Sequence, residues 1–328
     1  MLRARDITQF LHNRYGAVLM TLTAIVGVVI AHSKGLLSPL TGDFGLLVQS
    51  PENWFEQGSV SITVCIVLNV LVAFSAITLN KQYNTMRSLS MLVAGLFMIM
   101  QLSSPSVLCY LNGSVVMAVG ISIITLLLFS IFSDYANSRR VFLIFFLLAA
   151  FASFEYSFLF YVPVLFLGLS QMRVFTLRTF MAAIIGFITP AWILAGFGLI
   201  TLDSIKLPDF TPFITAINTP GIWLQLSVTG FTIILGLTFM AMNVMKMLSY
   251  NSRIRAANGF LTTLMLATML FIFIDYNNIM VYVVLLNILV SYQVGHYFAT
   301  HIQSQNSYIG ILSLLFIYLS FFVLRLVL

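Results

Sequence analysis

The first long loop between apolar segments carries three acids, Asp43, Glu52 and Glu56. A carboxylate in such a loop can act as a general base toward an acceptor hydroxyl, or hold a divalent cation beside a phosphate. The alternative is that the three acids only solvate an exposed loop. The residues around Asp43, Thr41 to Gly45, are also typical of a simple turn.

A further acid, Glu155, lies between two short apolar segments, in the sequence Phe151–Ala152–Ser153–Phe154–Glu155–Tyr156–Ser157. A carboxylate at an apolar boundary is costly, which favours a functional role. The alternative is that Glu155 marks the water-exposed apex of a turn. Asp275, before Asn277 and Asn278, fits a turn residue.

We therefore expect Glu155 and an acid of the first loop, Asp43 first among them, to be catalytic and to face one outward-opening cavity. If that cavity binds a phosphate-linked lipid, Mg²⁺ or Mn²⁺ is the expected cofactor, because both prefer hard oxygen ligands.

Other chemical motifs are absent from the sequence. It contains no GxxxxGK[ST], no GxGxxG after a strand and no HExxH, which argues against a nucleotide-driven pump and a soluble-type oxidoreductase. The two cysteines, Cys65 and Cys109, both lie in apolar runs and indicate neither a disulfide framework nor a metal site.

The composition indicates a membrane protein. Of the 328 residues, 60% are hydrophobic and 7% are charged, and the mean hydropathy is +1.05. A soluble domain carries about 25% charged residues, so the expected partner is the lipid bilayer. The net charge of +6 is spread along the chain, which argues against nucleic-acid binding.

Apolar runs of about 20 residues predict membrane-spanning helices. The expected fold is an all-α, polytopic transmembrane bundle of about eleven spans, with nine or ten as alternatives. Two of the spans are short, and they form either two crossings or a re-entrant pair. The expected spans are 16–33, 59–79, 89–109, 113–133, 141–153, 156–170, 179–200, 221–245, 258–274, 277–296 and 308–327.

The basic residues predict a cytoplasmic N-terminus and an external C-terminus, because Lys and Arg collect in cytoplasmic loops. With this orientation only Lys34, Lys206 and Arg325 are external. Twelve of the 15 basic residues are then cytoplasmic: Arg3, Arg5, Arg14, Lys81, Arg87, Arg139, Arg140, Arg173, Arg178, Lys246, Arg253 and Arg255.

Four of these arginines, Arg139, Arg140, Arg173 and Arg178, suit either of two roles. They can act as topology anchors, or they can bind lipid phosphate head groups. The first span also allows a second interpretation, since Ala31–His32–Ser33 could be a signal-peptide cleavage site. We favour anchors and an uncleaved first span.

Two outer loops, 34–58 and 202–220, combine prolines with apolar residues, which predicts that both rest on the membrane surface. All other loops are short. Residues 1–328 are therefore expected to form a single transmembrane domain without a soluble domain, and any chemistry would occur inside the bundle or at its outer face.

Three stretches of the chain resemble an uncharacterised family of polytopic inner-membrane proteins of Bacteroidota. They run from Asn80–Lys81 to Leu89, from Phe154–Glu155–Tyr156 to Pro163, and from Arg178–Thr179–Phe180 to Pro190. The resemblance covers about a third of the chain. It implies a bacterial inner-membrane location and supplies no activity.

A weaker resemblance is to multi-spanning glycosyltransferases that use polyprenyl-phosphate sugars, which also have a cytoplasmic N-terminus and a catalytic acid in a long first outer loop. The chain departs from them at Tyr110–Leu111–Asn112–Gly113, where they carry a second acidic motif. This resemblance implies a polyprenyl-phosphate-linked sugar as substrate.

Three hypotheses for the function follow. The first is envelope glycoconjugate biogenesis on a lipid-linked sugar at the outer face. The second is a non-catalytic subunit or scaffold, with other membrane proteins as partners in an envelope-assembly complex. The third, a transporter, ranks last because the prolines within spans show no repeat pattern.

Overall fold

The computed structural model describes residues 4–34, 47–55, 58–86, 88, 90–134, 137–198, 222–301 and 307–327. Within these ranges the secondary structure is helical, with no strand. The α-helices are α1 (Ala4–His12), α2 (Arg14–Ser33), α3 (Ser59–Tyr83), α4 (Leu92–Leu102), α5 (Pro105–Cys109), α6 (Gly113–Ser130), α7 (Ser138–Phe154), α8 (Tyr161–Gln171), α9 (Leu177–Gly196), α11 (Ile222–Met247), α12 (Ser252–Ile274), α13 (Ile279–Thr300) and α14 (Ser307–Val327). Short 3₁₀ helices occur at η1 (Pro51–Asn53), η2 (Tyr156–Phe160) and η4 (Tyr276–Asn278).

Eight helices in the described ranges, α2, α3, α6, α9, α11, α12, α13 and α14, are long and apolar enough to cross a membrane. The large apolar side chains on their outer faces support this assignment. Trp192 is 75% exposed, Phe197 just beyond α9 is 78% exposed and Phe316 is 72% exposed, which suits contact with lipid. The prediction of an integral membrane protein built as a helix bundle is therefore confirmed.

The shorter apolar segments are also helical. The run expected at 89–109 is broken at Ser103 and Ser104, where α4 ends and Pro105 starts α5 as its first residue. Proline suits this position because the first helical N–H has no intrahelical acceptor. The pair expected at 141–153 and 156–170 corresponds to α7 and to η2 with α8, and the chain turns between them at Glu155.

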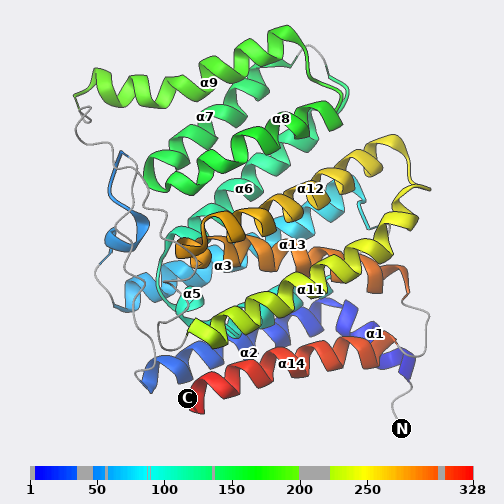
Figure 1. Ribbon diagram of the computed structural model, residues 1–328. Coiled ribbons are helices and arrows are strands. Elements are labelled where there is room, and N and C mark those ends of the chain that lie inside the picture. The colour runs from blue at the N-terminus through cyan, green and yellow to red at the C-terminus, as the bar shows by residue number, and fades with distance from the viewer. Residues whose placement is uncertain are drawn as a thin grey trace.

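The helices pack around α13, which runs through the middle of the bundle (Figure 1). It contacts α4, α6, α11 and α12, and nearly all of its side chains are buried. A predominantly apolar helix suits such a central position, and α13 also buries the polar side chains of Asn287, Gln293 and His296 there. By contrast, α9 and α14 lie at the edges, with α9 packed mainly on α7.

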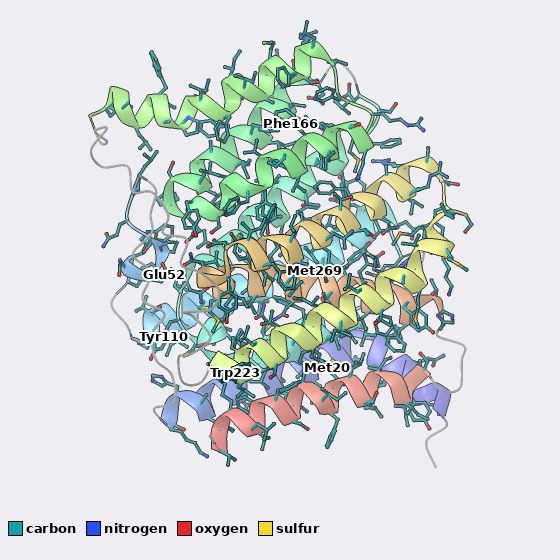
Figure 2. The ribbon with its side chains drawn as sticks, viewed as in Figure 1. Met20, Glu52, Tyr110, Phe166, Trp223 and Met269 are labelled. Atoms are coloured by element: carbon teal, nitrogen blue, oxygen red, sulfur yellow. The ribbon has the colours of Figure 1, made fainter. Side chains whose placement is uncertain are left out.

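The two ends of the bundle are distinct. The described chain begins at one end and finishes at the other (Figure 1). We call the end that holds the C-terminus the C-terminal face; α7, α12 and α14 end there, and α3, α6, α11 and α13 begin there. The opposite end is the N-terminal face. Glu52, Tyr110 and Trp223 lie toward the C-terminal face (Figure 2).

Candidate functional site

Glu155 lies at the C-terminal face, in the turn between α7 and η2. The apolar helix α7 ends there because Glu155 adopts an extended conformation, with φ −144° and ψ 110°. Its side chain is only 4% exposed. Oε1 accepts a hydrogen bond from the Ser157 hydroxyl at 3.0 Å. Glu155 is therefore buried, and the interpretation as a water-exposed turn apex is wrong.

A second carboxylate, Glu52 of η1, meets Glu155 at the first residue of α6. The backbone N–H of Gly113 donates to Glu52 Oε1 at 2.7 Å. A Cβ atom at Gly113 would lie 2.6 Å from Glu155 Oε2 and 3.5 Å from Glu52 Oε1. The two carboxylates therefore converge on the N-terminus of α6, whose dipole stabilises negative charge. Glu52 Oε2 is buried and has no hydrogen-bond partner among the described residues.

The end of the first long loop positions Glu52. The backbone N–H groups of Leu47 and Val48 both donate to the Ser153 carbonyl oxygen, at 3.1 and 3.0 Å. The Trp54 ring packs edge-on against Phe154 with centroids 5.0 Å apart. These contacts join the loop to the turn that carries Glu155, and so bring together residues about 100 positions apart in the sequence.

Asp275 is a third carboxylate at the C-terminal face, and it is 1% exposed. Its Oδ2 accepts hydrogen bonds from the Tyr156 hydroxyl at 2.6 Å and the Tyr282 hydroxyl at 2.9 Å. Its Oδ1 accepts from Asn278 at 3.0 Å. Asp275 does follow α12 as a turn residue, as expected. Its carboxylate is also buried against Tyr156, the residue that follows Glu155, and a turn residue alone does not predict this burial.

The surroundings of Glu155 favour its neutral form. The pKa of its carboxyl group is raised from 4.5 to about 8, chiefly by burial and also by the negative charges of Glu52 and Asp275. Hydrogen bonds from Ser157 act in the opposite direction. A carboxyl group that exchanges its proton near neutral pH suits acid–base chemistry.

Comparison of the chain with protein-family models, with curated proteins and with solved structures finds no match.

The predicted partner of Glu155, Asp43, lies outside the described residues. The acid that the structure brings to Glu155 from the same loop is Glu52. Across the described part of the chain, no group of three or more His, Cys, Asp or Glu side chains is placed to hold a metal ion.

The four predicted anchoring arginines are exposed and lie far from these acids along the bundle, where α7 and α9 begin and α8 ends. Arg140 donates from Nη1 to the carbonyl and hydroxyl oxygens of Ser130, at 3.2 and 2.9 Å, and so caps the C-terminal end of α6. Arg173 occupies the left-handed turn after α8, with φ 57°. Arg139 and Arg178 lie in the first turns of α7 and α9.

An apolar cavity of about 200 Å³ lies between α7, α8 and α9, with Phe145, Phe166 and Phe187 among its lining residues. Figure 2 labels Phe166 in the part of the bundle formed by these helices. The cavity is lined only by apolar side chains, so it can accept a hydrocarbon group but offers no catalytic residue.

Several residues of the site belong to no recognisable sequence motif. Gly113 and Ser157 are small residues without a motif, and Tyr156 and Tyr282 resemble the other aromatic residues of the spans. A buried carboxylate requires hydrogen-bond donors. The need for the hydroxyl groups of Ser157, Tyr156 and Tyr282 therefore becomes clear only once the burial of the acids is known.

Proposed function

We propose that the chain crosses a bacterial inner membrane eleven times, with its N-terminus cytoplasmic and the C-terminal face external. Support comes from the apolar helices, from the opposite positions of the two termini (Figure 1), and from the twelve basic residues that this orientation assigns to the cytoplasm.

We further propose that the protein acts in envelope glycoconjugate biogenesis, as a glycosyltransferase-like enzyme on a polyprenyl-phosphate-linked sugar at the outer face. The observation that carries this proposal is the convergence of Glu52 and Glu155 on Gly113. Carboxylate oxygens are suitable acceptors for sugar hydroxyl groups. The Glu52 oxygen without a partner in the described residues is available for such a bond.

In the proposed reaction Glu155 is the general base. Its ionised carboxylate takes the proton of the acceptor hydroxyl, whose oxygen forms a bond to the anomeric carbon. The bond from that carbon to the phosphate oxygen breaks, and the lipid phosphate leaves with the electron pair. Asp43 stays in the proposal as a second acid from the same loop, and Glu52 as the acid that orients the hydroxyl.

A non-catalytic subunit of an envelope-assembly complex is the second candidate. It is favoured by the Asp275 cluster, whose carboxylate oxygens are occupied by Tyr156, Tyr282 and Asn278. A set of hydrogen bonds satisfied in this way stabilises the end of a bundle without needing a substrate.

The enzyme and the non-catalytic subunit can be distinguished by the effect of Glu155→Gln on turnover. The full chain is reconstituted in liposomes with a panel of polyprenyl-phosphate sugars and hydroxyl acceptors, and the release of free polyprenyl phosphate is followed by mass spectrometry. We expect turnover by the wild type and by Asp134→Asn, which removes an exposed acid outside the site, but at least a hundredfold loss in Glu155→Gln. Equal turnover by Glu155→Gln, or none by the wild type on any donor, favours the scaffold.

A further inference from the structure

A second polar cluster at the C-terminal face contains hydrogen-bond donors in excess of acceptors. Gln225 of α11 accepts two hydrogen bonds on Oε1, from Arg325 Nη1 at 2.9 Å and from the Ser104 hydroxyl at 3.2 Å. The cluster therefore joins α14, α11 and the break between α4 and α5. Figure 2 labels Trp223, which lies two residues before Gln225 in α11.

The orientation of the Gln225 amide follows from these contacts. Arg325 only donates, so the atom that faces it must be the amide oxygen. The amide nitrogen, Nε2, then points away from Arg325 and Ser104. Gln225 is 2% exposed, and its Nε2 has no hydrogen-bond partner among the described residues. A buried donor without an acceptor costs about 1–3 kcal/mol, so a ligand that supplies an acceptor is favoured.

The guanidinium group of Arg325 also requires hydrogen-bond acceptors. Among the described residues it donates a hydrogen bond to the neutral amide oxygen of Gln225. The side chain is partly buried in a helix that faces lipid, where an unpaired cation is costly. One turn further along α11, the hydroxyl of Thr229 is also buried without a partner in the described ranges.

We propose that Arg325 and Gln225 bind a phosphate group, presented by the head group of a membrane lipid at the C-terminal face. A guanidinium group binds phosphate oxygens through paired N–H donors, and the free N–H groups of Gln225 Nε2 add further donors. Ser104 is a positioning residue, since its hydrogen bond holds the Gln225 oxygen away from the ligand. The partly exposed Arg325 leaves the site open to the lipid.

This site shares no residue with the Glu52–Glu155 pair, and its test requires no turnover, so the two proposals stand or fall separately. The probes are short-chain phosphatidic acid, a diacylglycerol with the same chains, and inorganic phosphate. Binding to the detergent-solubilised full chain is measured by native mass spectrometry. We expect phosphatidic acid to bind and diacylglycerol not to bind.

Two variants and one control decide the assignment. Arg325→Gln removes the cation, and Gln225→Glu keeps an acceptor for Arg325 and Ser104 while adding a negative charge. Each should weaken phosphatidic acid binding about tenfold or more. Arg255→Gln, which removes an exposed arginine at the start of α12 on the N-terminal face, should leave it unchanged.

If inorganic phosphate binds as tightly as phosphatidic acid, the site is assigned to a free anion. If inorganic phosphate does not bind, the site is assigned to the lipid head group. Either result supports phosphate recognition. The proposal is overturned if phosphatidic acid does not bind the wild type. It is also overturned if folded Gln225→Glu protein, with the elution volume and helicity of the wild type, binds phosphatidic acid as the wild type does.

Discussion

The backbone N–H of Gly113 donates to Glu52 Oε1 at 2.7 Å, although the two residues are 61 positions apart in the sequence. This bond joins the first long loop to the N-terminus of α6. Because Gly113 has no Cβ atom, Glu155 Oε2 can occupy the space directly beside it. One glycine thus allows two carboxylates to lie at one helix end.

The close approach at Gly113 can be tested with Gly113→Ala. The added Cβ would lie 2.6 Å from Glu155 Oε2, so the Glu155 side chain or the turn must move. We expect a loss of about 1–3 kcal/mol in stability, measured as a lower Tm of the detergent-solubilised protein.

Two further variants show whether Glu155 is the cause. Gly230→Ala is the control, because a Cβ atom there meets nothing within 4 Å, and it should leave the Tm unchanged or raise it. Adding Glu155→Ala to Gly113→Ala should cost less than the sum of the single changes. Strict additivity would contradict the contact.

The buried carboxyl group of Glu155 predicts a pH-dependent stability. The pKa of Glu155 is raised from 4.5 to about 8 in the folded protein. Its neutral form is therefore favoured by folding, and this contribution is fully present below pH 4.5 and is lost as the pH rises to about 8. Between pH 5 and pH 9 the free energy of unfolding of the wild type should fall by a few kcal/mol. That of Glu155→Gln should not show this fall.

The measurement is the Tm of both proteins across this pH range. A difference in Tm between Glu155→Gln and the wild type that stays constant with pH would show that Glu155 titrates normally. If Glu155 is also the general base of the proposed reaction, turnover should rise with pH up to about 8, because only the ionised form accepts a proton.

The proposed orientation predicts the location of individual segments. Reporter fusions after Arg140 and after Arg178 should both report the cytoplasm, and a fusion near Asp209 should report the external side, because basic residues resist translocation. A cytoplasmic signal at Asp209 would exclude the eleven-span arrangement.

The two arginines at the start of α7 should act on insertion and not on activity. Replacing Arg139 and Arg140 with Gln removes two cytoplasmic charges and the bonds from Arg140 to Ser130 at the end of α6. We expect lower yield or mixed orientation, measured by the same fusions, with normal phosphatidic acid binding by correctly inserted protein. Normal orientation together with a loss of turnover or of phosphatidic acid binding would instead support a phosphate-binding role for Arg139 and Arg140.

The sequence by itself determined the membrane environment, the helical class and the approximate limits of the helices. The reason is that these properties are local: a run of about 20 apolar residues is sufficient to specify a spanning helix. The short helices around Glu155 are predicted in the same way, by an acid between two apolar segments with basic residues on either side.

Only the tertiary structure decided which polar groups meet. Asp43 and Glu52 belong to the same loop, and nothing in their neighbours shows that Glu52 is the one held at Gly113. The burial of Asp275 depends on Tyr156, 119 residues earlier, and the Gln225–Arg325 contact spans 100 residues. Hydrophobicity specifies which segments enter the membrane, but the pairing of buried polar groups is set by how the helices pack, because a donor and an acceptor need only be close in space.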